Sequence, residues 1–104
     1  RDEVFFTYSN LAWLYATCPD VKFRDGQKSL ALAKKACSLN GGGTPYDLDT
    51  LAAANAELGA FDEAIRYQSQ AVQAASESKK EAYKERLKLY TNRKPFRDEV
   101  KKKL

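Results

Sequence analysis

Alanine and leucine recur at helical spacing along almost the whole chain, and glycine or proline interrupts this pattern repeatedly. No segment alternates apolar and polar side chains for long enough to indicate a β-strand. A chain of this kind can bury its apolar residues only by packing helices against one another. The sequence therefore predicts an all-α fold.

Proline and glycine mark the ends of the predicted helices. The residue before a proline is pushed out of the helical region, so Cys18-Pro19 ends the first helix, and the glycines at 41–43 end the second. Thr44-Pro45 is a start signal, because threonine caps free N–H groups and proline at the first helical position loses no hydrogen bond. The predicted helices cover residues 2–17, 27–39, 45–58, 61–75 and 78–91, with a loop at 19–26 and a tail at 92–104.

A length of 104 residues and a hydrophobic content of 43% fit one globular domain with one core. The longest apolar run, Leu11 to Ala16, is far shorter than the roughly 20 residues of a membrane span, so we expect no membrane partner. The residues predicted to pack are Val4, Tyr8, Leu11, Ala12 and Tyr15 in the first helix, Leu48, Leu51, Ala52 and Asn55 in the third, and Tyr83, Leu87 and Tyr90 in the fifth.

Two cysteines bear on the compartment. Cys18 ends the first predicted helix and Cys37 lies well inside the second, which separates them by roughly 16 Å along the helix axis. A disulfide requires Cα atoms within about 7 Å. We predict two free, largely buried thiols, which are compatible with the cytoplasm. The chain begins with arginine and lacks methionine, so it is expected to be a fragment or a processed product, and the localisation stays open.

The net charge of +4 is unevenly distributed. Residues 1–78 carry 7 basic and 10 acidic side chains, whereas residues 79–104 carry 11 basic and 4 acidic ones. A basic C-terminal arm of this kind can contact nucleic acid or an acidic partner. The favoured interpretation is a solvated helix followed by a tail.

The residues that usually carry catalysis or bind metals are scarce. There is no histidine, no Cys-x-x-Cys pair, and no partner that would activate either cysteine. The glycines at 41–43 follow a predicted helix and match neither nucleotide-binding spacing. Asp47 and Asp49 do not share a helix face, and Asp62 and Glu63 fit the first turn of a helix. The sequence therefore predicts no enzyme, no cofactor and no metal site.

Two segments of the chain repeat the same pattern. Lys34-Lys35-Ala36-Cys37 aligns with Ser69-Gln70-Ala71-Val72 at an offset of 35 residues, and Leu11-Ala12 aligns with Leu51-Ala52 at an offset of 40. The longer loop at 20–24 accounts for the difference. The sequence therefore contains two helix–turn–helix units, of which the first has an insertion.

The second unit carries Leu48, Leu51-Ala52, Gly59, Phe61-Asp62-Glu63-Ala64-Ile65 and Ala71, and through these residues it resembles the tetratricopeptide repeat (TPR). The phrases at 11–14, 16–20, 24–26 and 48–54 are similar to a bacterial subgroup of that family. The resemblance covers roughly residues 5–97, with Asn55 and Ser76 as departures, and the first unit is also similar to Sel-like repeats. The small alanines allow paired helices to approach closely, and Gly59 allows a sharp reversal.

The resemblance implies a right-handed superhelical α-solenoid in a single domain, 1–104. Its parts are two antiparallel repeats at about 3–40 and 45–76, a capping helix at about 78–91, and the tail at 92–104. In this family the first helix of each unit lines a concave groove that accepts a peptide or a partner helix. The groove residues implied here are Phe6, Asn10, Trp13, Thr17, Tyr46, Asp49, Ala53, Glu57 and Tyr83, with Lys80 and Lys84 as further candidates.

The leading hypothesis is therefore a protein–protein interaction module or scaffold. One alternative is a connecting domain of a larger protein, or a self-associating domain, that packs through the apolar edge of the first helix. A second alternative is contact with nucleic acid through the basic arm, which predicts a salt-sensitive affinity.

Overall fold

The computed structural model describes residues 2–41 and 43–98, with side chains from Thr7 onward. The described part is helical and contains no strand, which confirms the predicted all-α class. Its elements are α1 (Asp2–Thr17), a short 3-10 turn η1 (Val21–Phe23), α2 (Gly26–Leu39), α3 (Pro45–Glu57), α4 (Phe61–Ala74) and α5 (Glu77–Thr91).

Polar side chains start the helices where the sequence predicts. The Thr44 hydroxyl accepts a hydrogen bond from the backbone N–H of Asp47 at 3.2 Å, and the Asp47 carboxylate accepts one from the Thr44 N–H at 3.3 Å, which is a capping box. Asp25 caps α2 by accepting from the Lys28 N–H at 3.0 Å. The predicted loop at 19–26 also contains η1, a turn too short to give a periodic signal.

Left-handed residues follow three of the helices: Gly41 after α2, Gly59 after α3 and Arg93 after α5. Gly59 follows α3 with φ +82°, and the next N–H, of Ala60, donates to the carbonyl of Asn55 at 2.8 Å. The same geometry follows α5, where the Lys94 N–H donates to the Leu89 carbonyl at 3.0 Å. There the left-handed position is held by Arg93, at φ +60°, and not by a glycine.

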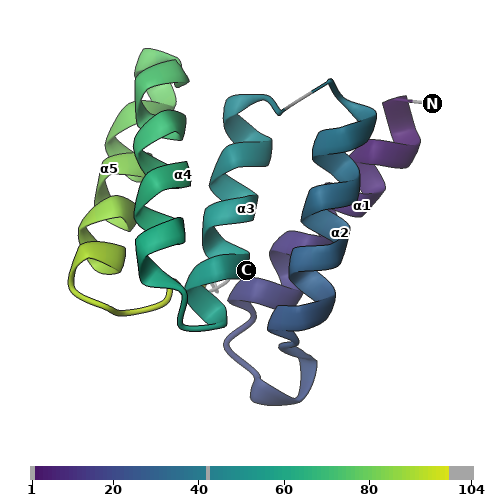
Figure 1. Cartoon of the computed structure of the whole chain (residues 1–104), viewed down its shortest axis with the longest axis horizontal. Coiled ribbons are helices and arrows are strands. Elements are labelled where there is room, and N and C mark those ends of the chain that lie inside the picture. The colour runs from purple at the N-terminus through teal and green to yellow at the C-terminus, as the bar shows by residue number, and fades with distance from the viewer. Residues whose placement is uncertain (1, 42, 99–104) are drawn as a thin grey trace, which may run out of the picture.

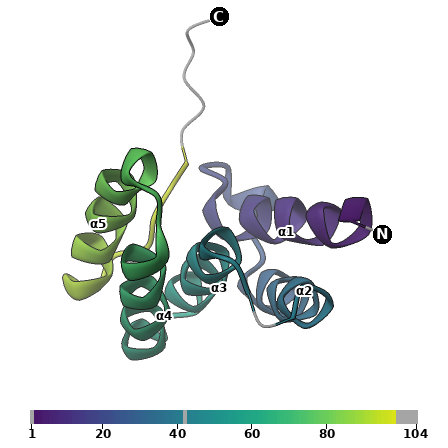
Figure 2. The same ribbon diagram turned by 90° about the horizontal axis from the view of Figure 1, so that it is seen from above.

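The helices form two layers. Figure 1 shows them side by side, and Figure 2 shows α1, α3 and α5 on one side with α2 and α4 on the other. The most extensive packing joins α1 to α2 and α3 to α4, while α5 packs on α4. Helix α3 lies in the centre, because it packs on α1 and α2 as well as on α4, and it is buried on nearly every face.

Small residues dominate the core. One cluster contains Ala52, Ala56, Ala64 and Tyr90, and a second contains Ala12, Ala33 and Leu51. Alanines at helix crossings let the backbones approach closely, while larger side chains pack around them.

The prediction that Leu11 packs inward is wrong, since it is 40% exposed. The neighbouring Ala12 is fully buried, together with Ser9 and Ala16. Helix α1 therefore turns its small residues toward α2 and α3, and its leucine lies outside that contact.

A buried carboxylate joins the first three helices. Asp47 accepts a hydrogen bond from the Ser9 hydroxyl of α1 at 2.8 Å and another from the Asn40 amide, at the end of α2, also at 2.8 Å. Buried charges are normally satisfied by such donors. The start of α3 is thus fixed to both preceding helices.

Candidate functional site

The layer of α1, α3 and α5 carries the candidate site, and the chain itself passes through it. After α5 the backbone turns at Arg93 and runs between α5 and α1 (Figure 2). Residues 95–98, which we call the C-terminal strap, contact side chains of α1, α3 and α5. The structure thus fixes the first part of the predicted tail at 92–104, while residues 99–104 lie outside the described part.

Arg86 of α5 is the centre of the site. Its guanidinium donates two hydrogen bonds to Asp49 of α3, at 2.9 and 3.0 Å. The same guanidinium lies over three aromatic rings, with centroid distances of 5.1 Å to Trp13, 5.2 Å to Tyr83 and 4.8 Å to Phe96. A planar guanidinium can pair with a carboxylate and stack on rings at once, which a lysine cannot do. Arg86 therefore holds α1, α3, α5 and the strap together.

The ion pair between Arg86 and Asp49 is buried, so each charge depends on the other for its stability. Asp49 is only 2% exposed, and burial raises its pKa, against the opposing effect of Arg86 and of the Gln68 amide, which donates to it at 2.9 Å. Removing one member of a buried pair leaves the other uncompensated. Burial likewise raises the pKa of Tyr83 beside this pair.

The strap is held by an aromatic contact and by polar contacts. The Phe96 ring lies 5.8 Å from the Trp13 ring, centroid to centroid. The Asp98 N–H donates to the Thr17 carbonyl at 2.9 Å, and the Asp98 carboxylate accepts from the Trp13 indole N–H at 2.6 Å. The strap therefore binds α1 through both backbone and side chains.

Glu57, in the last turn of α3, supplies the acidic contact. It pairs with Arg97 of the strap at 2.8 Å and with Arg24 at 3.2 Å. The Arg24 guanidinium also donates to the carbonyls of Cys18 and Pro19. One carboxylate thus fastens both the strap and the loop after α1 to the centre of the fold.

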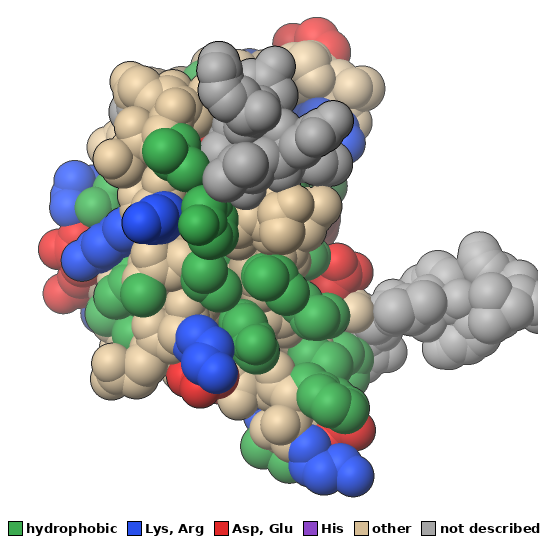
Figure 3. Space-filling view, turned by 90° about the vertical axis from the view of Figure 1, so that its right-hand side faces the viewer, with side chains coloured by type: hydrophobic (Ala, Val, Ile, Leu, Met, Phe, Trp, Pro, Cys, Tyr) green, Lys and Arg blue, Asp and Glu red, His purple; other side chains and the backbone are tan. Residues whose placement is uncertain are grey.

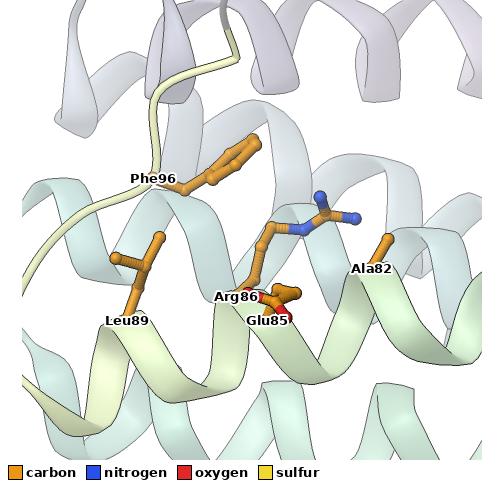
Figure 4. A pocket seen from close by; sticks show the side chains of 5 residues that line it. All are labelled: Ala82, Glu85, Arg86, Leu89 and Phe96. Carbon is orange, nitrogen blue, oxygen red and sulfur yellow. The ribbon is translucent and has the colours of Figure 1, made fainter.

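A hollow of about 390 Å³ remains beside the strap. Figure 4 shows that its lining comes from the exposed side of α5 and from the Phe96 ring, with the Arg86 guanidinium extending across it. The lining residues are Ala82, Glu85, Arg86, Leu89 and Phe96. The hollow therefore lies between the strap and α5.

The structure brings together most of the groove residues predicted from the sequence. Trp13, Thr17, Asp49, Glu57 and Tyr83 all lie in or under the contact with the strap and Arg86.

Some of the predicted groove residues do not reach the surface. Four of the nine are buried and therefore closed to a partner in this arrangement: Thr17, Asp49, Ala53 and Tyr83.

The other predicted residues lie outside the contact with the strap. Asn10 and Tyr46 pair with each other, because the Tyr46 hydroxyl donates to the Asn10 side chain at 3.0 Å. Lys80 is half-buried, and Lys84 is exposed beside Glu81. The side chain of Phe6 is outside the described residues.

Four residues of the site were not predicted from the sequence: Arg86, Phe96, Arg97 and Asp98. A signal for Arg86 exists, because it lies three residues after the inward-facing Tyr83 and supplies the countercharge that a buried Asp49 requires. Phe96 is the one aromatic residue after Tyr90, in a strongly charged segment, which is unusual for a solvated tail. Arg86 and Arg97, both in the basic arm, pair with carboxylates of this chain, which leaves fewer free cations for nucleic acid.

Comparison of the chain with models of protein families, with curated proteins and with solved structures gives no match.

Within the described residues, no His, Cys, Asp or Glu side chains gather in the groups of three or more that hold metal ions. Cys18 and Cys37 are free, as predicted, and both are half-buried. None of the helices described is both long and apolar enough for a membrane span.

Proposed function

We propose that the chain is a TPR-like protein-interaction module with no catalytic role. In this proposal α1–α2 and α3–α4 are two antiparallel repeats of a superhelical stack, and α5 caps the second. The more extensive packing within these pairs supports it, as does the repeated sequence pattern at offsets of 35 and 40 residues. The charged outer face of α5 is what a terminal repeat helix requires for solubility.

The groove formed by α1, α3 and α5 is the proposed site for an extended peptide of a protein partner. One observation carries this proposal: the same surface already holds residues 95–98 of the chain through a backbone hydrogen bond, an ion pair and an aromatic contact. A surface that binds one short extended segment in this way has the donors, acceptors and apolar area that a similar peptide requires.

Trp13→Ala tests this function. Trp13 is half-buried and contributes both a ring face and an N–H donor to the groove. Short peptides selected from a random library against the wild-type chain should lose about tenfold or more in affinity on this substitution, because aromatic anchors carry much of an interface's binding energy.

The control is Tyr67→Ala, which removes an aromatic side chain of α4 that packs against both core clusters and supplies none of the strap contacts described above. Selected peptides should bind Tyr67→Ala and the wild type alike wherever the helical circular dichroism is preserved. Peptides that bind Trp13→Ala as tightly as the wild type, or a selection that enriches nothing, would rule out a peptide-binding groove.

A second candidate function is packing through the outer face of α1 and α2. Figure 3 shows hydrophobic side chains gathered on this face. Exposed apolar patches often mark contact sites. The large apolar side chains exposed in this part of the chain are Leu11, Leu14, Val21, Phe23 and Leu39.

Sedimentation over a range of concentrations tests this second function as self-association through the α1–α2 face. Leu14→Glu should reduce the mass of any assembly that uses the face. A monomer at every concentration would exclude self-association there.

A further inference from the structure

We infer that the C-terminal strap is a built-in competitor for the groove, so that a partner peptide with an aromatic, a basic and an acidic residue in that order binds only by displacing residues 95–98. This inference rests on the proposed function and deepens it, because it specifies the class of partner and how access is controlled.

The strap satisfies each part of the groove with a different chemical group. The aromatic side chain of Phe96 lies against Trp13 and the Arg86 guanidinium. The cation of Arg97 pairs with Glu57, and the carboxylate of Asp98 accepts from the Trp13 indole. The order Phe-Arg-Asp is therefore the order of side chains that this surface accepts from an extended segment.

The backbone of the strap contributes independently of its side chains. The Asp98 N–H donates to the carbonyl of Thr17, the last residue of α1. Carbonyls at the end of a helix lack a partner within the helix. Any extended peptide can supply this donor. The side chains of such a peptide would then decide whether it outcompetes the strap.

Several features favour release of the strap. The Asp98 side chain is exposed, and Phe96 and Arg97 are only half-buried. The hollow of about 390 Å³ beside Phe96 leaves part of its ring without packing. Arg93, two residues before the strap, is held in a left-handed conformation that favours glycine. A terminal segment whose side chains are partly or fully exposed opens at a lower free energy than the helical core.

Charge complementarity defines the partner further. Glu57 is half-buried and shared between Arg97 and Arg24, so a displacing peptide must bring a cation to replace Arg97. A peptide with an acidic residue at that position would place two carboxylates together, which is strongly unfavourable in a partly desolvated site. We therefore infer a partner with arginine or lysine directly after its aromatic residue.

Trp13 provides the measurement, because it is the only tryptophan in the chain and it contacts the strap. The test uses the full chain with Phe96→Ala, and Lys94→Ala as the matched control, since Lys94 is exposed and adjacent to the strap. Phe96→Ala should shift the Trp13 emission to the red, as expected for an indole exposed to water, while Lys94→Ala should leave it unchanged.

The binding probe is a blocked peptide of sequence Asn-Arg-Lys-Pro-Phe-Arg-Asp, which copies residues 92–98. It should bind the Phe96→Ala chain about tenfold more tightly than the wild type or Lys94→Ala, because an occupied site lowers apparent affinity by the fraction of molecules that are open. The same peptide with alanine in place of phenylalanine should bind weakly to all three. Arg97→Ala removes one ion pair and no core contact, so its affinity for the peptide should rise by less than that of Phe96→Ala.

Each contrary outcome has a distinct meaning. Unchanged Trp13 emission in a folded Phe96→Ala chain would overturn docking of the strap. Equal peptide affinity for the wild type and Phe96→Ala would overturn competition but keep the groove as a binding site. If the emission shifts and neither chain binds any peptide, the proposed function fails along with this inference. A wild-type dimer that Phe96→Ala dissociates would make the occupant a second copy's strap, which overturns control within one chain.

Discussion

Single residues in this molecule combine tasks that the sequence pattern treats separately. Arg86 pairs with Asp49 and stacks on rings of α1, α5 and the strap, although in sequence it is one cation within a basic helix. Arg93 both ends α5 and directs the chain toward α1. Neither role depends on periodicity, and both depend on what another part of the chain brings close.

Arg93 is the site of a prediction about backbone strain. Arg93→Gly should be more stable than Arg93→Ala by about 1 kcal/mol, because both lose the same side-chain contacts and only glycine adopts the left-handed conformation without a steric cost. Urea unfolding of the two variants measures the difference. Comparing them removes the contribution of the exposed ion pair with Asp62. Equal stabilities would mean that the segment relaxes when it is not held by arginine.

Whole helices show which features were readable from the sequence. The five helices were predicted to within one residue at each end, since breakers and caps act locally. The face of α1 that is buried was not predicted correctly. Whether Leu11 or Ala12 is the buried residue depends on how closely α2 and α3 approach α1. The residues of α1 and α3 that contact the strap were singled out through the family resemblance, whereas the strap itself was missed because its few residues lack any periodic pattern.

Helix α3 carries a prediction about how elements are joined. Thr44→Ala removes one cap and should cost about 1 kcal/mol. Asp47→Ala removes the acceptor for Ser9 and Asn40 and leaves a buried hydroxyl without its partner, so it should cost about 3 kcal/mol. Urea unfolding measures both, with Asp62→Ala as a control because its side chain is 90% exposed. If Asp47→Ala cost no more than Thr44→Ala, the links to α1 and α2 would contribute nothing to stability.

The molecule as a whole encloses several weak acids that prefer to stay protonated. Burial, with a contribution from Asp47, raises the pKa of Cys37 from 9.0 to about 11. Burial also raises the pKa of Tyr46, Tyr83 and Tyr90. The hydroxyl of Tyr90 is buried and has no hydrogen-bond partner among the described residues. These groups all affect the pH dependence of folding in one direction.

The resulting prediction is a loss of stability in alkali. A raised pKa in the folded chain contributes stability that is full below the unfolded pKa and lost as the pH rises toward the folded value. For Cys37 this window runs from 9.0 to about 11, and for Tyr90 it begins at 10.0. The free energy of unfolding, measured by urea at pH about 8 and about 11, should therefore fall.

Tyr90→Phe isolates one contribution to this loss, because it removes the unpartnered hydroxyl. The free energy of unfolding of this variant should fall less between the two pH values than that of the wild type. At the lower pH the variant should be more stable than the wild type by about 1 kcal/mol. A fall as large as that of the wild type would show that Tyr90 ionises equally in the folded and unfolded chains.

The strap also has a consequence for the order in which the chain folds. Most helix contacts join neighbouring elements, whereas the bond between Trp13 and Asp98 spans 85 residues. Contacts of high sequence separation require closure of a long loop and form late. We expect helix pairs to assemble first and the strap to close last. In refolding experiments, the tryptophan signal should then lag behind the recovery of helical circular dichroism.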